Sequence, residues 1–533
     1  MAGSPKATYN ASMSRSQSWA LAAALSLTAA GCALAPYWLA AGLVGQGASF
    51  SGFLINPQDG FSYLAKMRQG ALGAWGFLLP YASAPGEPVL LFVYYLALGH
   101  LARLFGMPLL YTYHAARLLG TLLMFLAAYA LLEVCLQQAR ARWAAFVLIL
   151  FGSGLGWLGL PFGIWGNDLL IPEAIPWFAG LTNAHFPLAG AALLGLFYAL
   201  LDRQTRLPRR AMLAAWCSLV LAVVQPFALL VPPLAAAGWS LIEIWRQRRT
   251  RPLMQVVRAQ RDAAIIVGAA LLASLPVLLY DMWITQVHPG LRSWSAQNQT
   301  PAPPLLETLL GFGLPLLLAG LALWRSPESG APGPRLLAAW FAAGLLMVFL
   351  PFSLQRRMLL GLYFPLAGLA GLGLAWLSER GLRFVPALGL VLALGLPSNL
   401  VVAAAGVTAA GRLDPGVTIR DDELQSYRWL EAHASGGALV LAGPVNGNRL
   451  PAFADVRVLY GHPFESPEAE KSQRLVAALY GAGEASEGLL RAHQIDYALY
   501  GPEEQSLGSP AWLDTLRPLY RVGEVTLYQV PEQ

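Results

Sequence analysis

Long apolar runs separated by short polar links fill the chain from residue 19 to residue 407. A run of about 20 mainly apolar residues can cross a membrane as a helix. On this criterion we predict about 11 transmembrane helices, near 19–45, 109–135, 143–160, 186–201, 211–225, 226–245, 262–284, 304–324, 335–353, 358–377 and 384–407. The pattern predicts a polytopic α-helical membrane protein. Gln225-Pro226 marks either a turn between two helices or a kink in one.

The first apolar run predicts an uncleaved helix. It follows Lys6 and Arg15 and continues to about Val44, well past Cys32, whose surroundings resemble a lipoprotein cleavage site. The apolar region of a signal peptide is shorter than this run. We therefore expect residues 1–18 to form a cytoplasmic tail.

Basic residues are divided unevenly between the two sides of the predicted membrane. If segment 88–105 does not cross, the links on the N-terminal side contain 16 arginines. The opposite loops contain six basic residues, which are Lys66, Arg68, Arg103, Arg292, Arg356 and Arg357. Cytoplasmic loops carry an excess of Lys and Arg. We therefore predict a cytoplasmic N-terminus and place 88–105 on the outer face as a horizontal or re-entrant helix.

The first outer loop contains a short stretch that predicts an interfacial amphipathic helix. From residue 60 to residue 69, apolar residues recur at helical spacing, and Gly70 is a plausible C-cap. Asp59 begins this helix, with Lys66 two turns further along the same face. Two interpretations of Asp59 stay open. It is a helix cap, or it is a catalytic carboxylate.

The composition changes near residue 408, where charged residues become frequent. The pattern predicts helices at 421–433, 467–480 and 487–493, strands at 438–442, 457–460 and 495–500, and a hairpin-like pair at 519–530. Strands alternating with helices are typical of a small α/β fold. We predict a transmembrane domain at 19–407 and a soluble, extracytoplasmic α/β domain at 408–533.

Composition narrows the class of protein and its location. Of 533 residues, 56% are hydrophobic and 12% are charged, and the net charge is +6. Because the arginines lie in short links between apolar runs, we expect membrane lipids and no nucleic acid as partners. The few lysines (Lys6, Lys66 and Lys471) favour a GC-rich bacterial genome, and hence the bacterial plasma membrane. The three cysteines imply no disulfide framework.

Three features of residues 19–407 carry a resemblance to a known family. They are Gln58-Asp59-Gly60-Phe61-Ser62-Tyr63 in the first outer loop, the aromatic segment Pro88 to Phe105, and Tyr113-His114-Ala115-Ala116-Arg117-Leu118. Together they resemble the GT-C superfamily of polyprenyl-phosphate-dependent glycosyltransferases, among them protein O-mannosyltransferase-like and lipid A aminoarabinose transferase-like enzymes. The resemblance implies an inverting glycosyltransferase with a polyprenyl-phosphate sugar donor, a glycan, lipid or protein acceptor, and Asp59 as base.

This chemistry needs one base and a positive site for the phosphate. A carboxylate can accept the proton of the attacking hydroxyl, and arginine binds phosphate with two parallel hydrogen bonds. Arg356 and Arg357 are adjacent on the predicted outer side and are the main candidates. The alternative is that they contact lipid headgroups. Arg117 and Lys66 are further candidates for the phosphate, and Arg117 equally fits a snorkelling role.

Other outer-loop residues are candidates for binding the acceptor or a metal. Asp168, Glu173 and His185 could place the acceptor, hold a divalent cation such as Mg²⁺ or Mn²⁺, or solvate the loop. Trp294, Gln297 and Asn298 could contact sugar or shape a turn. The outer loops contain no Asp-x-Asp pair of the metal-dependent oligosaccharyltransferase branch, so metal dependence stays open.

His462, Glu465 and Glu468 form a polar group in the C-terminal part of the chain. We interpret them as solvated surface residues rather than as metal ligands. Two rival functions also stay open, a lipid or oligosaccharide transporter or flippase, and a non-catalytic membrane scaffold. Transporters concentrate ionisable groups near midmembrane, whereas here these groups gather in the outer loops.

Overall fold

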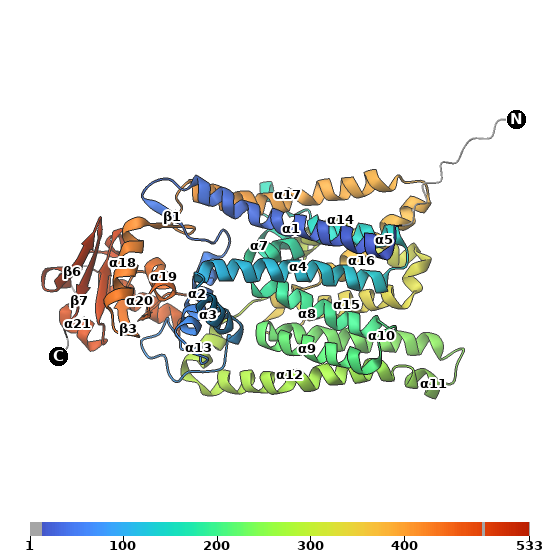
Figure 1. Cartoon of the computed structure of the whole chain (residues 1–533), viewed down its shortest axis with the longest axis horizontal. Helices are drawn as coiled ribbons and strands as arrows, with labels where there is room; N and C mark the ends of the chain where they lie inside the picture. Colours follow the sequence, from blue (N-terminus) through green and yellow to red (C-terminus); the bar gives the residue numbers. More distant parts are fainter. Residues whose placement is uncertain (1–12, 482–485, 532–533) are drawn as a thin grey trace.

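The computed structural model describes residues 13–481 and 486–531. A long helix bundle carries a small α/β unit at one end, and α1 begins at the other end (Figure 1). The bundle contains α1 (Arg15–Leu43), α4 (Leu109–Cys135), α5 (Ala139–Phe151), α8 (His185–Leu201), α9 (Leu207–Val224), α10 (Val231–Gln247), α12 (Arg261–Val287), α14 (Leu305–Arg325), α15 (Pro332–Phe349), α16 (Tyr363–Glu379) and α17 (Phe384–Gly411). The predicted polytopic α-helical fold with a C-terminal α/β part is confirmed.

Among the described residues, nine helices are long and apolar enough to cross a membrane, or up to ten if one bent pair is a single span. That pair is Ala139–Phe151 with Gly156–Phe162, bent by 52°. The prediction of about 11 differs for two reasons. The run 143–160 is broken after α5, and α8 has only 17 residues, about 26 Å.

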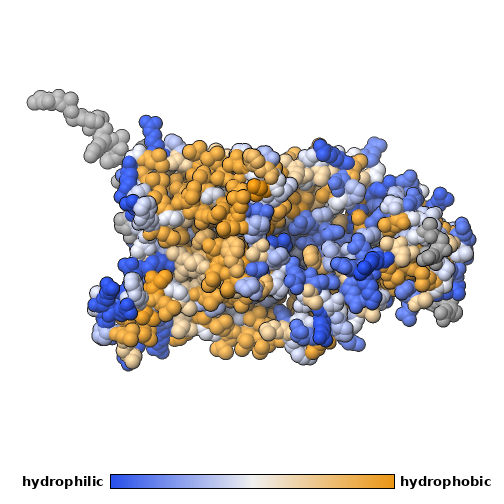
Figure 2. Space-filling model, turned by 180° about the vertical axis from the view of Figure 1, so that it is seen from behind, coloured by the Kyte–Doolittle hydropathy of each residue, from blue (hydrophilic) through white to orange (hydrophobic). Residues whose placement is uncertain are grey.

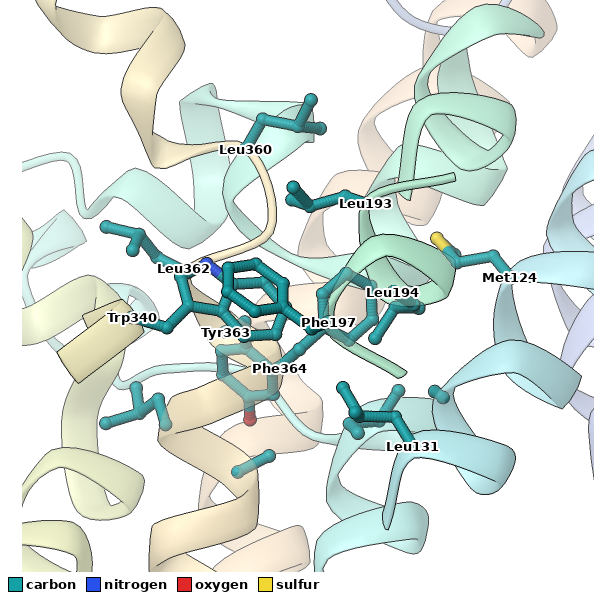
Figure 3. Close-up of a cluster of buried hydrophobic side chains, with 14 of the residues drawn as sticks. Met124, Leu131, Leu193, Leu194, Phe197, Trp340, Leu360, Leu362, Tyr363 and Phe364 are labelled. Carbon is teal, nitrogen blue, oxygen red and sulfur yellow. The ribbon is translucent and has the colours of Figure 1, made fainter. Parts of the chain in front are cut away.

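The surface of the bundle matches a membrane environment. On the face seen in Figure 2, a broad apolar band covers the helices, bordered by polar residues at the far end of the bundle and on the α/β unit. α16 lies at the centre of the bundle, and its residues from Tyr363 to Ala375 are all buried. Around it, aromatic and aliphatic side chains of α4, α8 and α15 interlock, with Trp340 stacked 3.8 Å from Phe197 between ring centroids (Figure 3).

Short helices cover the end of the bundle that carries the α/β unit. They are α2 (Pro57–Ala71), α3 (Val93–Phe105), α6 (Asn167–Leu170), α7 (Pro176–Thr182) and α13 (Pro289–Gln297). Between them run the 3₁₀ turns η3 (Pro172–Ala174), η4 (Pro226–Leu230) and η6 (Gln355–Leu359). With 13 residues, α3 is about 20 Å long, too short to cross a hydrocarbon core of about 30 Å.

α2 confirms the predicted helix in the first loop, with one correction. The helix runs to Ala71, so Gly70 is not its C-cap but a point of contact with α3. A Cβ on Gly70 would overlap the carbonyl oxygen of Leu96, and a Cβ on Gly99 would overlap that of Met67. The two glycines therefore let the backbones of α2 and α3 touch. This crossing fixes the helix that carries Asp59.

The α/β unit contains a five-stranded mixed sheet in the order β4-β3-β5-β7-β6. Its strands are β3 (Ala438–Leu441), β4 (Val456–Val458), β5 (Tyr497–Tyr500), β6 (Arg517–Val522) and β7 (Val525–Gln529). Its helices are α18 (Asp421–His433), α19 (Pro444–Phe453), α20 (Ala469–Tyr480), α21 (Glu487–Ala492) and α22 (Pro502–Leu507). β3 pairs in parallel with β4 and β5, whereas β7 pairs antiparallel with β5 and β6. Helices α19 and α22 were not predicted.

Several contacts hold the α/β unit against the short helices. β1 (Ala48–Phe50) pairs antiparallel with β2 (Thr418–Arg420), and the Val458 N–H donates to the carbonyl of Pro80 at 2.9 Å. Arg68 of α2 forms an ion pair with Glu431 of α18. These contacts join chain segments that are far apart in sequence, so the unit is docked on the first loop. The division of the chain at residue 408 into two domains stays a prediction.

Candidate active site

A cavity of about 710 Å³ lies where the bundle meets the α/β unit. α2, η3, η4, α12, η6 and the segment after β4 all contribute to its wall. Of the residues singled out in the sequence, the lining includes Asp59, Glu173, His185, Trp294, Asn298, Arg356 and Arg357. The structure thus gathers residues from widely separated stretches of the chain around one space.

Asp59 lies in the first turn of α2. Asn56 is the N-cap, in the left-handed region at φ 48°, and Pro57 begins the helix. The side chain of Asp59 is 37% exposed, and its Oδ1 lies 3.1 Å from Nε2 of His462 in the α/β unit. The N-cap of α2 is Asn56, and the hydrogen-bond partner of the Asp59 carboxylate is this imidazole.

The charge of Asp59 follows from its neighbours. Burial raises the pKa of Asp59, but the hydrogen bond from His462 and the charges of Arg357 and Lys66 outweigh burial and hold the pKa below its usual value. Asp59 is therefore a carboxylate at neutral pH. A base near a substrate hydroxyl has to be in this form.

Arg356 and Arg357 belong to η6 and line the cavity. The Arg356 N–H donates to the carbonyl of Thr300 at 3.0 Å, and Gln355 Oε1 accepts from the Ala302 N–H at 3.1 Å, so the turn is fixed to the loop after α13. Neither arginine forms an ion pair with any residue that the structure describes. A guanidinium group without an ion-pair partner is able to bind an anion through charge-assisted hydrogen bonds.

Four buried polar residues, which we call the polar wall, line the same cavity as Arg357. Glu173, Asn183, His185 and Gln225 line the cavity and are buried. Nδ1 of His185 lies 2.6 Å from the Tyr95 hydroxyl, whereas the buried Nε2 of Gln225 has no hydrogen-bond partner in the described part of the chain. Buried amides normally find a partner, so a bound polar molecule fits this wall. Asn183 and Gln225 were not predicted as site residues from the sequence.

His462 and Glu465 correct the sequence-based interpretation. Both were read as solvated surface residues, but both are buried and line the cavity. Glu465 accepts from Lys66 Nζ at 2.8 and 2.7 Å and from the Ser62 hydroxyl at 2.7 Å. Burial raises the pKa of Glu465, but the charge and hydrogen bonds of Lys66 outweigh it and lower the pKa below the usual value. Glu468 is on the surface, as expected.

Four predicted site residues lie outside the cavity lining. Lys66 is fully buried and neutralised by Glu465 rather than facing a phosphate. Arg117 Nη1 donates to the carbonyls of Gly180 and Leu181 at 2.7 and 2.8 Å, so it binds the C-terminal end of α7. Gln297 Nε2 donates to the carbonyl of Ser466 at 2.6 Å and thereby joins α13 to the α/β unit.

Asp168, in α6, is also outside the lining, and its side chain contacts the break between α5 and η1 (Gly156–Leu158). Its Oδ2 accepts from the Gly156 N–H at 3.1 Å, which replaces a helical hydrogen bond lost at the break. The predicted metal trio of Asp168, Glu173 and His185 is therefore not assembled. Among residues 13–481 and 486–531, no group of three or more His, Cys, Asp or Glu side chains is placed to hold a metal ion.

No protein-family model and no curated protein sequence matches the chain. Solved structures do match, and they are membrane glycosyltransferases of the GT-C fold. The chain has this fold.

The chain is similar over 96% of its length to ArnT from Cupriavidus metallidurans bound to undecaprenyl phosphate, with 98% of that chain covered, 11% identity and a TM-score of 0.54. The match to the arabinofuranosyltransferase AftD from Mycobacteria covers 98% of this chain and 42% of the AftD chain. The identity is 19% and the TM-score is 0.52. The match to the oligosaccharyltransferase of Archaeoglobus fulgidus, in complex with Zn and sulfate, covers 89% of this chain and 67% of that chain. The identity is 13% and the TM-score is 0.50.

Proposed function

We propose that this chain is a membrane glycosyltransferase that moves a sugar from a polyprenyl-phosphate donor to an extracytoplasmic acceptor with inversion. One observation carries the proposal. Asp59 and the pair Arg356–Arg357 line the same cavity, although about 300 residues separate them in the sequence. The GT-C fold, and the undecaprenyl phosphate bound to ArnT, support a lipid-phosphate donor.

In this mechanism Asp59 is the base. The acceptor hydroxyl oxygen attacks the anomeric carbon of the donor sugar, and the bond from that carbon to the phosphate oxygen breaks. The hydroxyl proton passes to the Asp59 carboxylate, and the bonding electron pair leaves with the polyprenyl phosphate. General base catalysis of this kind contributes typically ~10²–10⁴ in rate.

Arg356 and Arg357 stabilise the leaving group. Negative charge grows on the phosphate as the bond breaks, and fixed positive groups in a site sheltered from water stabilise it strongly. The phosphate is a weakly basic leaving group, so the reaction needs no second carboxylic acid. The Arg357 guanidinium carbon also lies 5.4 Å from the ring centroid of Phe227, which restricts its position.

The polar wall and the α/β unit supply the remaining contacts. Glu173, Asn183 and Gln225 can hydrogen-bond sugar hydroxyls, whereas Trp294 and the 44% exposed ring of Phe464 offer apolar faces to a sugar or acceptor. We place this cavity on the extracytoplasmic side, because the arginine-rich links lie at the opposite end of the bundle. No step is assigned to a metal ion, since the acidic residues do not gather into a ligand set.

Two rival functions fit the cavity less well. A transporter or flippase needs ionisable groups along a path through the membrane, whereas Asp59, Arg356 and Arg357 share one end of the bundle. In a non-catalytic scaffold, a carboxylate and two arginines that form no ion pair within the described part of the chain would line the cavity without a task.

Binding of undecaprenyl phosphate tests the phosphate site. Purified protein in detergent is titrated with undecaprenyl phosphate at fixed ionic strength, and Arg356→Ala and Arg357→Ala are compared with Arg474→Ala, an exposed arginine of α20. Loss of a hydrogen bond to a charged group weakens binding by roughly 10–100-fold. Unchanged affinity in both cavity variants would remove the arginine pair from the site.

A further inference from the structure

The hydrogen bonds of His462 define which of its ring nitrogens carries a proton. Nδ1 accepts from the backbone N–H groups of Phe464 at 3.2 Å and Glu465 at 3.3 Å. In the neutral imidazole the proton therefore lies on Nε2, which is 3.1 Å from Oδ1 of Asp59. The ring thus donates its single N–H to the carboxylate.

We propose that His462 is a positioning residue that holds the Asp59 carboxylate for catalysis, so that the α/β unit completes the active site. The inference rests on the proposed function, because it assigns a task to His462 only if Asp59 acts as base. Holding Oδ1 leaves Oδ2 to face the acceptor hydroxyl. A base that is held in one orientation reacts more often than one that rotates freely.

The segment that carries His462 is itself fixed. Ser466 Oγ accepts from the N–H groups of Gly461 and His462 at 3.2 and 3.1 Å, and the Ser466 N–H donates to the His462 carbonyl at 3.0 Å. Glu465 joins the segment to Lys66 and Ser62 of α2, the same helix that carries Asp59. The segment that carries the imidazole is therefore attached to the helix that carries the carboxylate, which fixes the two groups relative to one another.

Other ionisable groups also act on Asp59, so the test must separate His462 from them. Arg357 and Lys66 are positive, Glu465 lies beside His462, and the remaining titratable neighbours are Tyr63, Tyr81, Tyr95 and His185. Of these groups, His462 is the one that hydrogen-bonds Asp59. Its removal should raise the pKa of Asp59 while the other charges stay in place.

The experiment measures this shift without a substrate. A water-soluble carbodiimide modifies a carboxyl group in its protonated form, so the extent of Asp59 labelling against pH, read by peptide mass spectrometry, reports its titration. His462→Ala should move the midpoint to higher pH. His462→Gln can place an amide N–H near the position of Nε2 and should restore the midpoint in part. His433→Ala, an exposed histidine of α18 in the same unit, is the matched control.

Turnover supplies the second readout. With an undecaprenyl-phosphate sugar as donor, His462→Ala should lower kcat by roughly 10–100-fold and leave undecaprenyl phosphate binding unchanged, with Gln retaining more kcat than Ala. An unchanged labelling midpoint in His462→Ala overturns the inference. If that variant does not fold, equal midpoints in His462→Gln and His462→Asn overturn it, because Asn cannot reach Asp59. Normal turnover in Asp59→Asn would instead reject the proposed function, whatever the labelling shows.

Discussion

The ion pair between Lys66 and Glu465 is the interaction whose loss we expect to weaken the fold most. Lys66 has a fully buried side chain, and that of Glu465 is 12% exposed. Lys66 Nζ donates to both carboxylate oxygens and to Ser62, and it lies 4.3 Å from the ring centroid of Phe92. In Lys66→Met the bonds from Nζ are lost and only the Ser62 hydroxyl still donates to Glu465, so a buried carboxylate is left without its cation.

Removing one partner of a buried ion pair costs about 3–5 kcal/mol, mainly because the other charge stays buried and unpaired. We expect this loss for Lys66→Met and for Glu465→Leu. The double variant Lys66→Met/Glu465→Leu removes both charges, so it should lose less than the sum of the two. The exposed pair Lys471–Glu468, with side chains 77% and 62% exposed, is the matched control, worth at most about 1 kcal/mol.

The free energy of unfolding is measured by SDS titration of protein in mixed micelles, for both single variants, the double variant and the control. The pH dependence gives a second check. Because the folded pKa of Glu465 lies below its usual 4.5, its contribution is complete above pH 4.5 and is lost as the pH falls through the folded pKa. Losses that add without coupling, or a Lys66→Met loss no larger than that of Lys471→Met, would refute the reasoning.

Two further expectations concern the crossing of α2 and the arginine pair. In Gly99→Ala the new Cβ would overlap the Met67 carbonyl oxygen, so α2 and α3 should separate and both thermal stability and turnover should fall. Gly106→Ala is the control for backbone strain. Its Cβ position has open space around it, but its φ of 62° is strained for alanine. In Arg356→Lys and Arg357→Lys the charge stays but the forked geometry is lost, so undecaprenyl phosphate binding should weaken, though less than in the Ala variants. Unchanged binding in both Lys variants would indicate that the arginines contact lipid headgroups only.

The sequence was informative where the signal is local. The run predicted at 109–135 has the same bounds as α4, and 421–433 those of α18, because bilayer length and helical periodicity act on neighbouring residues. Asp59 and the arginine pair were singled out because they lie in loops beside apolar runs, and the structure places all three at one cavity. The predicted number of about 11 transmembrane helices did not take into account that glycines near residue 154 interrupt the apolar run 143–160.

The remaining site residues depend on contacts between distant segments. His462 lies 403 residues from Asp59, and Glu465 lies 399 residues from Lys66. No periodicity in either segment reveals such a pair, so His462 and Glu465 looked like surface residues. Arg117 and Asp168, which lie outside the cavity lining, show the opposite case. Each is a charged residue in a suggestive place, but backbone groups at helix ends and breaks bind it.

The most direct test of the central claim is the turnover of Asp59→Asn. Asn is nearly the same size and caps a helix as well as Asp, so folding and undecaprenyl phosphate binding should be unchanged. Release of undecaprenyl phosphate from an undecaprenyl-phosphate sugar in the presence of acceptor membranes should fall by roughly 10²–10⁴, with Glu470→Gln, an exposed carboxylate, as control. Turnover of Asp59→Asn close to that of the unaltered protein would contradict the assignment of Asp59 as the base.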